Sequence, residues 1–479
     1  MGEKFDDKHI ARFIENEVNQ LGTEELRRIY VGVGSAAYPP ELMLKMALFE
    51  YLEGRASPAQ WHRDAPVHDA LKWLGRGLCP SRSACYAFRD RLDKVIQELH
   101  QKVVRQTVEQ GLAAPVEAAQ DGTTFRSQAS RHRAFNQDTL HNRRAKLDAA
   151  IAADDDQAPP PDPQPKWMPL TPQGRLDLQD RMENAQQRLA AEWQKNGEKP
   201  QKERRLEKNI VVSLTDPDAC FARDKEKTFC FLYTAQFLVD ADSLLVLGYS
   251  VSPENTDVGT LPPMIDQVQP LVGETLKRVS VDAGYTSLLD LIDCHARHID
   301  LLGPVQSNSF TTKKQSPHAS QPISKADFVW LENEQTYQCP QGHKLFREFR
   351  ERIKRHAGRH VIGYCYRCPA EFCTACPLKD RCTKNPDKGR TVRRMEREDL
   401  IEAQHAKMQR EDNKAIYRKR GQTVERPFAD AKGHRNFSRL HGRGLSRATA
   451  EVGLLVLAQN ILTVQRRRKN AATPEKQAA

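Results

Sequence analysis

The sequence predicts an α/β protein in which an all-α N-terminal domain precedes a mixed-sheet core, and a small metal-binding insertion interrupts that core. Apolar residues recur at helical spacing over residues 1–110, whereas β-rich segments alternate with short helical ones from Ile210 onward. Six of the eleven cysteines fall between Cys339 and Cys382. At 479 residues the chain is too long for one compact core, so we expect several domains.

The charge balance predicts a polyanionic partner. The formal net charge is +11, which favours nucleic acid or an anionic membrane surface. No apolar run approaches the length of a membrane span, and the first ten residues are too polar for a signal peptide. The cysteines are clustered rather than spread as in a secreted disulfide framework, which indicates a reducing cytosol.

The N-terminal segment is expected to be mostly helical scaffold. The run ELMLKMALFEYLEG begins after two prolines, has its apolar residues at helical spacing, and is ended by Gly54. Shorter amphipathic segments follow around Trp61, over Ala70–Leu74 and over Ala84–Leu99. Periodicity alone supports no sharper function for this part of the chain.

The core is expected to begin near Asp121, in the segment DGTTFRSQASRHR. Taken alone, this segment favours a turn, because Asp-Gly is a turn dipeptide and the preceding VEAAQ is poor strand sequence. Residues 130–207 then interrupt the core, since two charged and helix-prone stretches, Arg131–Ala153 and Arg175–Lys195, flank a proline-rich segment. We expect an exposed insertion with a flexible middle. A basic cluster in it forms either a solvated face or a DNA contact: Arg131, Arg133, Arg143, Arg144 and Lys146.

From Ile210 the pattern predicts strands and one functional carboxylate. Two β-rich runs joined at residues 240–243 predict a hairpin, and TLPPMIDQVQPLVG predicts a helix. Lys277–Tyr285 is expected to be a short strand with Asp282 at its carboxyl end, where ligand sites lie in open α/β sheets. Ser287 can cap the helix that follows. A turn role for Asp282 stays open, and its rivals as functional carboxylates are Asp216, Asp218 and Asp240.

The cysteine-rich segment predicts a structural zinc site. Its spacing is C-x2-C-x4-C-x2-C-x5-C after an earlier CPQGH, and thiolate pairs two residues apart can share one tetrahedral ion. Six thiols and His343 exceed one tetrahedral site, so spacing does not assign the four ligands. An iron–sulfur cluster is the rival, although its usual short cysteine spacing is absent. The candidate ligands are Cys339, Cys365, Cys368, Cys373, Cys376 and Cys382.

A single glutamate, Glu425, stands among basic residues in the segment YRKRGQTVERPFADAK. Gly421 is expected to end one helix and Thr423 to cap the next, which places Glu425 in a first turn, where the helix dipole favours carboxylates. Lys432 lies two turns further along the same face. The local pattern also fits a solvated basic helix with one incidental glutamate. An apolar helix over residues 452–464 should pack on the core sheet, and the basic tail 466–479 should be disordered.

Together these segments resemble the insertion-sequence DDE transposases. The tyrosine, arginine, catalytic glutamate and lysine of the family's C-terminal signature are matched by Tyr417, Arg420, Glu425 and Lys432. Arg420 departs from the family by lying one residue further from the glutamate than usual. Asp121 with Gly-Thr resembles the family's first catalytic block, and Asp282 with Ala-Gly-Tyr resembles the second. The segments YPPELMLKMALFEYLEG and SRSACYAFRDRL resemble the N-terminal helical domain of InsH-type transposases.

The resemblance implies an RNase H-like core in which Asp121 ends the first strand and a helix brings Glu425 to Asp121 and Asp282. On this division of the chain, residues 1–110 bind DNA or dimerise, and residues 310–400 form the zinc-binding insertion. The two parts of the core are residues 111–309 and 401–465, followed by the basic tail 466–479.

The resemblance also implies an activity, namely cleavage at the terminal inverted repeats of the element and joining of the 3′ hydroxyls to target DNA. Three carboxylates would hold Mg²⁺ or Mn²⁺, because hard oxygen ligands suit these ions and two ions can activate water and stabilise the leaving oxygen. A homodimer acting on DNA in the bacterial cytoplasm, near the nucleoid and without a membrane, is expected. The residues expected to bind phosphates are Tyr417, Arg418, Arg420 and Lys432. The alternatives are a non-catalytic or domesticated DNA-binding protein and a nuclease without strand transfer.

Overall fold

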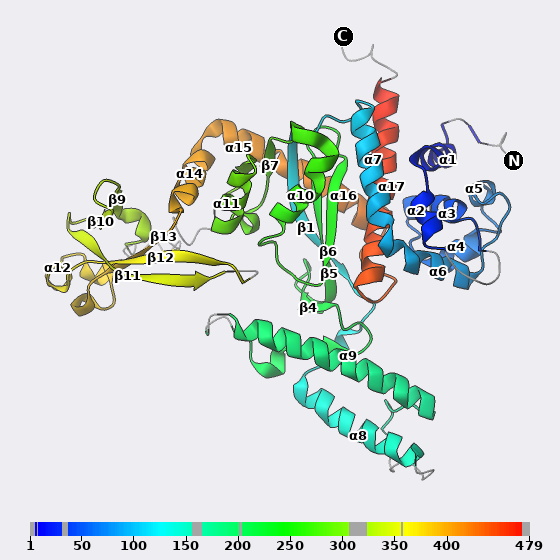
Figure 1. Cartoon of the computed structure of the whole chain (residues 1–479), viewed down its shortest axis with the longest axis horizontal. Coiled ribbons are helices and arrows are strands. Elements are labelled where there is room, and N and C mark those ends of the chain that lie inside the picture. The colour runs from blue at the N-terminus through cyan, green and yellow to red at the C-terminus, as the bar shows by residue number, and fades with distance from the viewer. Residues whose placement is uncertain are drawn as a thin grey trace.

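The computed structural model describes residues 5–6, 8–30, 37–155, 165–199, 201, 204–305, 323–355 and 358–471. A central β-sheet forms the middle of an elongated molecule (Figure 1). The N-terminal helices lie at one end of this molecule, and a smaller β-rich lobe (residues 323–395) lies at the other. A helical hairpin projects from the side between them.

The central sheet is mixed, with three parallel strands in sequence β1, β7 and β8. Strand β5 runs antiparallel to β1, and both β6 and β4 pair antiparallel with β5 on its other side, giving the order β6–β5–β1–β7–β8. The strands are β1 (Glu117–Arg126), β4 (Cys220–Arg223), β5 (Phe229–Asp240), β6 (Val246–Ser252), β7 (Arg278–Ser280) and β8 (Asp300–Leu302). The predicted mixed sheet is confirmed, and the predicted hairpin joins β5 and β6.

Long helices cover the sheet. Helix α17 packs against α7 and β6, and α10 packs against the same two elements. The helices are α7 (Ile96–Glu109), α10 (Leu261–Val272), α11 (Leu288–Ala296) and α17 (Leu445–Ala471). By length and composition α17 could cross a membrane, but 78% of its most apolar stretch is buried inside the protein, where it is the central core helix. Since α17 extends to Ala471, the prediction of disorder from residue 466 is wrong for its first six residues; residues 472–479 lie outside the described residues.

The predicted helical N-terminal region is confirmed. Its remaining helices are α1 (Ile10–Leu21), α2 (Glu24–Arg28), α3 (Pro40–Leu52), α4 (Pro58–Asp64), α5 (Asp69–Leu74) and α6 (Arg82–Arg91). They share one continuous hydrophobic core with α7, α17 and the central sheet. The predicted boundary at residue 110 therefore does not separate two cores.

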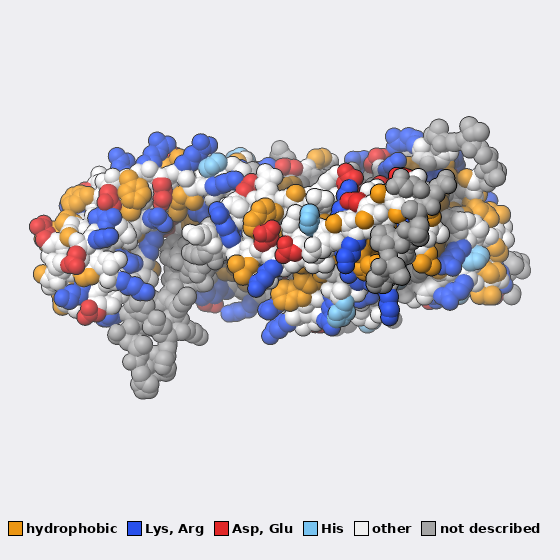
Figure 2. Space-filling view, turned by 90° about the horizontal axis from the view of Figure 1, so that it is seen from below, with side chains coloured by type: hydrophobic (Ala, Val, Ile, Leu, Met, Phe, Trp, Pro, Cys, Tyr) orange, Lys and Arg blue, Asp and Glu red, His pale blue; other side chains and the backbone are white. Residues whose placement is uncertain are grey.

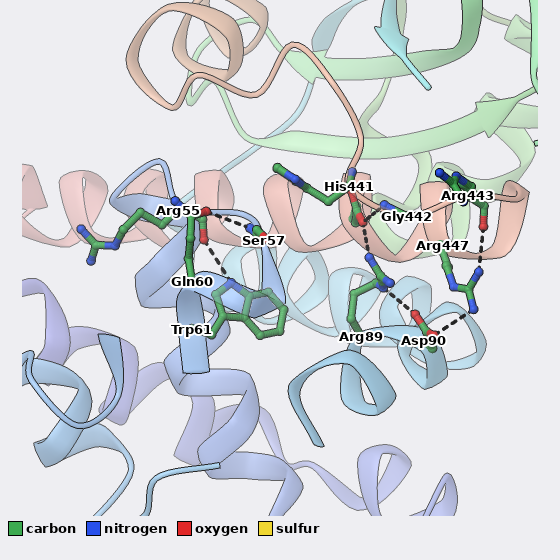
Figure 3. Close-up of polar contacts among 11 residues, drawn as sticks. Arg55, Ser57, Gln60, Trp61, Arg89, Asp90, His441, Gly442, Arg443 and Arg447 are labelled. Carbon is green, nitrogen blue, oxygen red and sulfur yellow. Dashed lines mark hydrogen bonds and ion pairs between the residues drawn. The ribbon is translucent and has the colours of Figure 1, made fainter. Parts of the chain in front are cut away.

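A buried ion pair fastens the N-terminal helices to α17. Arg89, in α6, donates from Nη1 to Oε1 of Glu451 over 2.5 Å, and both side chains are almost fully buried. Glu451 also accepts the backbone N–H groups of His441 and Gly442, each over 2.7 Å, in the network of Figure 3. Three donors thus offset the lost hydration of this carboxylate.

The projecting hairpin consists of α8 (Gln137–Asp155) and α9 (Pro172–Gly197), which match the two predicted helical stretches. Strands β2 (Ala134–Phe135) and β3 (Val212–Ser213) form its base. The hairpin has a small hydrophobic core of its own, to which Leu147 and Met182 belong. Most of the proline-rich middle that we expected to be flexible, residues 156–164, lies outside the described residues.

The β-rich lobe holds a five-stranded antiparallel sheet in the order β13–β12–β11–β10–β9. Its strands are β9 (Val329–Leu331), β10 (Thr336–Gln338), β11 (Lys344–Lys354), β12 (His360–Arg367) and β13 (Thr391–Met395). Two short helices, α12 (Ala370–Thr374) and α13 (Lys379–Cys382), lie in the connection between β12 and β13. Helices α14 (Glu398–Gln409) and α15 (Glu411–Arg418) return the chain to the central sheet.

Helix α16 (Arg420–Ala429) differs from its prediction. Gly421 and Thr423 lie inside this helix instead of ending one helix and capping the next, because α16 packs along β1 and β5 and buries Thr423 and Val424. Glu425 is therefore in the second turn. Pro427 is also internal, and the chain widens directly afterwards into a π-helical turn, η11 (Asp430–His434).

Candidate active site

Asp121 lies in the middle of β1, so the prediction that it ends the first strand is wrong, as is the turn reading of its Asp-Gly pair. The strand continues to Arg126 because β5 pairs with it along its whole length, with Phe237 opposite Asp121 and Gln236 opposite Gly122. Gly122 is required by close packing rather than by a turn. A Cβ there would lie 2.7 Å from Nε2 of Gln236 and 2.9 Å from Oδ1 of Asp257.

The parallel pairing of β1 with β7 brings Asp282 level with Asp121. The register pairs Ala118 with Val279 and Ala119 with Ser280. Two further residues along both strands lead to Asp121 and Asp282, which emerge at the carboxyl end of β7. Asp282 accepts the backbone N–H of Ala283 over 2.7 Å, while 58% of its side chain stays exposed. The structure thus brings the two sequence-predicted aspartates together at one edge of the sheet.

The guanidinium group of Arg420 lies between the two aspartates. Its Nη1 is 3.3 Å from Oδ2 of Asp121, and its Nη2 is 3.9 Å from Oδ2 of Asp282. Only 14% of the Arg420 side chain is exposed, and Nη1 is buried with no hydrogen-bond acceptor among the described residues. The ring of Tyr417 lies 5.9 Å from the guanidinium carbon. This arrangement holds a cation between two carboxylates, with Nη1 at ion-pair distance from Asp121 but without a well-aligned hydrogen bond.

Burial and neighbouring charges shift the pKa values of Asp121 and Arg420 in opposite directions. Burial raises the pKa of Asp121, although Arg420 and the N–H of Gly122 favour its ionised form. For Arg420 burial favours the neutral form, yet the carboxylate of Asp121 and the neighbouring Tyr417 and Asp282 raise its pKa above the usual value. The cluster therefore combines partly desolvated carboxylates with one permanently charged guanidinium.

A second polar group, which sequence reasoning missed, lies next to the aspartates. Asp257, in the loop after β6, accepts hydrogen bonds from Nε2 of Gln236 over 2.9 Å and from the hydroxyl of Tyr285 over 3.2 Å. The Tyr285 hydroxyl also contacts Oε1 of Gln236. A Cβ on Gly284 would lie 3.1 Å from Asp257, so this carboxylate lies beside the residues that follow both Asp121 and Asp282. The only sequence signal was a carboxylate in a polar loop between a strand and a helix.

Glu425 is not brought into the aspartate cluster. Its helix crosses the site, because Phe428, one turn further on, packs its ring 5.1 Å from that of Phe237, which is opposite Asp121. The Glu425 side chain itself is exposed, and its carboxylate lies nearest the position of Gly421. Among the described residues, no three His, Cys, Asp or Glu side chains converge closely enough to hold a metal ion.

The other predicted phosphate-binding residues occupy two different places. Arg418 is 73% exposed and its nearest carboxylate is that of Glu411, 3.9 Å away, so it is apart from the aspartates. Lys432 lies in η11, with its Nζ 5.4 Å from the ring centre of Phe125 near the end of β1. Burial and the neighbouring Lys225 lower the pKa of Lys432 to about 8.

The three rival carboxylates have structural roles. Asp216 is fully buried and accepts hydrogen bonds from Tyr233 and from the backbone N–H of Gly444. Asp218 accepts the backbone N–H of Leu445 over 3.0 Å, at the start of α17. Asp240 is buried in the β5–β6 hairpin, where it accepts the backbone N–H of Ser243. Each side chain is occupied by a local contact that fixes a turn or a helix start.

Five of the six candidate zinc ligands line one pocket in the β-rich lobe: Cys339, Cys368, Cys373, Cys376 and Cys382. Cys365 does not line this pocket and lies in β12. Burial raises the pKa of its thiol, and the neighbours that affect this pKa are charged residues rather than other thiols. Two backbone N–H groups point at sulfur over 3.4 Å, that of Leu378 at Cys376 and that of Arg390 at Cys373. Burial and the neighbouring thiols raise the pKa of Cys368 to about 12.

Two protein families match parts of the chain. Residues 338–464 match a family described as "Transposase DDE domain", and residues 1–91 match one described as "Transposase domain (DUF772)". The first match includes the pocket cysteines, Arg420 and Glu425, and the second includes Arg89 of the buried ion pair. No curated protein matches the chain.

Proposed function

We propose that this chain, an insertion-sequence DDE transposase by both of its family matches, cleaves the terminal inverted repeats of its element and joins the 3′ hydroxyls to target DNA. The observation that carries the proposal is the alignment of Asp121 and Asp282 at one edge of the sheet by the β1–β7 register. The strand order β6–β5–β1–β7–β8, with β1, β7 and β8 parallel, supports an RNase H-like core.

Asp121 and Asp282 are proposed to hold a divalent metal as two of its ligands. Asp121 and Asp282 offer hard carboxylate oxygens of the kind that Mg²⁺ and Mn²⁺ prefer, and the position of the Arg420 guanidinium between them supports a site for positive charge. A bound divalent ion supplies activation of water and stabilisation of the leaving oxygen. Glu425 is proposed as the third ligand, and support for it is limited to its helix crossing the site beside Asp121.

Arg420 is proposed to bind the scissile phosphate. Its Nη1 is buried beside Asp121 and lacks a hydrogen-bond acceptor among the described residues, so a phosphate oxygen would satisfy it. Tyr417 is close enough to hold the guanidinium from its other side. Arg418 and Lys432 lie further out and would contact backbone phosphates without reading sequence.

The β-rich lobe is proposed to hold one structural zinc ion. The presence of five cysteines in the lining of one pocket and the two N–H groups that point at sulfur support this proposal. Four of the five would bind the ion: Cys339, Cys368, Cys373, Cys376 and Cys382. Cys365 is left out of the proposed set because it faces other surroundings.

The N-terminal helices are proposed to bind the element ends or to form a homodimer on DNA, in the bacterial cytoplasm and without a membrane. The net charge of +11 supports a nucleic-acid partner. The buried Arg89–Glu451 pair joins the two family-matched parts, so end binding and chemistry would occur on one rigid body.

The decisive experiment incubates the protein with labelled element-end DNA, a supercoiled target plasmid and Mg²⁺. Joined products are expected for the natural protein, and Asp282→Asn should bind the ends but yield neither nicks nor joined products. Nicks without joining would instead identify a nuclease without strand transfer. Binding without nicks would identify a non-catalytic DNA-binding protein. Full cleavage by Asp282→Asn would refute the proposed site.

A further inference from the structure

Strands β11 and β12 form a long antiparallel ribbon whose two faces differ. Residues directly opposite each other share a face, so Ile353 and Val361 lie on one face while Arg352 and Ile362 lie on the other. Ile353 and Val361 belong to the hydrophobic cluster that includes Leu288 of α11. Near its tip, one face of the ribbon is therefore anchored to α11, and we call this the inner face. On the other, outer face Tyr366 and Tyr364 of β12 pack in the hydrophobic cluster of the lobe, while the β11 side chains opposite them are exposed.

A β-bulge aligns cations on the outer face. In the backbone register, Arg347 is opposite Tyr366 and Phe349 is opposite Cys365, so no residue of β12 lies directly opposite Glu348. This extra residue shifts the alternation of side chains. As a result, four cations of β11 lie on the outer face, and we name them the cationic row: Arg347, Arg350, Arg352 and Lys354.

The contacts of Arg347 agree with this register. Its guanidinium carbon lies 5.6 Å from the ring centre of Tyr364, and Tyr364 is directly opposite Arg350. The bulge therefore brings Arg347 and Arg350 to one face. Without it, the side chain of Arg347 would lie on the inner face with that of Phe349.

The three arginines of the cationic row lack ion-pair partners. All four side chains of the row are exposed. Lys354 forms an ion pair with Glu198 over 3.2 Å, but within the described part of the chain Arg347, Arg350 and Arg352 have no carboxylate within 4 Å. The inner face is different, because Arg393 pairs with Glu351 and Arg367 with Glu348, each over 2.7 Å. Within the described part of β11 and its neighbouring strands, the three arginines of the outer face are thus unpaired, whereas Arg367 and Arg393 of the inner face are paired.

The ribbon is fixed relative to the candidate active site. At its tip, Nη2 of Arg359 donates to Oδ1 of Asp293 in α11 over 3.0 Å. Helix α11 begins six residues after Asp282, so the same short segment carries both the aspartate and the anchor of the ribbon. A ligand bound along the cationic row would be held at a constant distance from Asp282.

We propose that the outer face of the β11–β12 ribbon binds the sugar-phosphate backbone of duplex DNA through Arg347, Arg350 and Arg352. The proposal rests on the proposed function only in taking DNA as the substrate. Alternate strand residues are about 7 Å apart, close to twice the rise per nucleotide of about 3.4 Å in one DNA strand. An antiparallel ribbon also fits the major groove, which is about 12 Å wide. In Figure 2, Lys and Arg side chains are among those exposed at this end of the molecule, interspersed with hydrophobic and acidic ones.

The test compares two double variants in the Asp282→Asn background, without divalent metal, so that cleavage does not enter. Arg350→Gln/Arg352→Gln removes two charges from the outer face, and Arg367→Gln/Arg393→Gln removes two from the inner face. The readout is the salt dependence of binding to a duplex of unrelated sequence and to an element end. An anionic phospholipid vesicle is the third probe. Equal melting temperatures would show that each variant is folded, which is expected because the outer arginines make no ion pairs.

The outer variant should flatten the slope of log K against log salt by about 2 units for both DNA probes, while the inner variant keeps the natural slope. Arg350→Lys/Arg352→Lys should restore the slope, since lysine also neutralises phosphates. An unchanged slope in the outer variant, or an equal loss in the inner one, would overturn the proposal. Loss of vesicle binding with DNA binding intact would overturn it in favour of a membrane surface. Because cleavage is absent from this assay, neither result depends on the activity proposed above.

Discussion

Arg420→Ala should tighten the binding of Mg²⁺ to the DNA-free protein. In the structure the guanidinium lies between Asp121 and Asp282, the position that a metal ion would take, so the ion has to displace it. At an effective dielectric constant of about 20, a unit-charge pair 3.3 Å apart attracts by about 5 kcal/mol. Desolvation of both groups offsets most of this. A net competition of about 1.4 kcal/mol would correspond to a roughly tenfold lower Kd for the variant.

The measurement is isothermal titration of Mg²⁺ into the protein, repeated with Mn²⁺, with the rise in melting temperature against metal concentration as an independent readout. Arg418→Ala is the matched control. It removes the same charge from two residues away, but that side chain is 73% exposed and touches neither aspartate. A general effect of the lost positive charge on Mg²⁺ affinity should appear in both variants. Only direct competition with the metal should make Arg420→Ala bind Mg²⁺ more tightly than Arg418→Ala.

Cleavage should respond in the opposite direction. If Arg420 also binds the scissile phosphate through its Nη1, Arg420→Ala should bind metal more tightly and cleave at least 100-fold more slowly, since misplaced reacting groups cost rate steeply, on the order of 10²-fold per ångström. Mg²⁺ affinity in Arg420→Ala equal to or weaker than that of Arg418→Ala would refute the reasoning. Arg420 would then support the carboxylates rather than occupy the metal position.

Three further predictions concern the rest of the molecule. Glu451→Ala should lower the free energy of unfolding in urea by about 3–5 kcal/mol, because it removes the buried carboxylate that pairs with Arg89 and leaves this guanidinium only its contact with Asp90. A loss below 1 kcal/mol would contradict this, and Arg89→Met/Glu451→Leu should lose less than the single variant. Cys365→Ser should retain zinc by elemental analysis while Cys368→Ser loses it, and equal zinc content in the two would disprove the proposed ligand set. Duplex binding should weaken as pH rises from 7 to 9, since Lys432 loses its charge as the pH passes its lowered pKa of about 8. Lys432→Arg should remove that part of the pH dependence. If Lys432→Arg and the natural protein had identical pH profiles, a phosphate contact of Lys432 would be excluded.

Local patterns predicted the helices and hairpins whose side chains repeat with a clear period. Ser287 caps α11 as expected, and the β5–β6 hairpin lies where its turn residues indicated. The errors arose where distant parts of the chain meet. Pairing with β5 outweighs the turn preference at Asp121, and packing on β1 carries α16 through Gly421. Cysteine spacing also could not show that Cys365 does not line the pocket that the other five cysteines share.

The one departure from the family signature explains the most unexpected feature of the site. Successive residues of an α-helix are about 100° apart, so Arg420 and Glu425, five residues apart on α16, differ by about 140° around its axis. Arginine at the usual spacing would stand at position 421, about 40° from Glu425. The glycine found there agrees with this, because a Cβ on it would lie 3.3 Å from Oε1 of Glu425. One α-helical orientation therefore directs either Arg420 or Glu425 at the aspartates, but not both. Since Arg420 holds that position in the structure, entry of Glu425 into the site requires α16 to turn or to unwind, and Pro427 inside α16 and the π-helical turn that begins at Asp430 make this part of the helix the place for such a change.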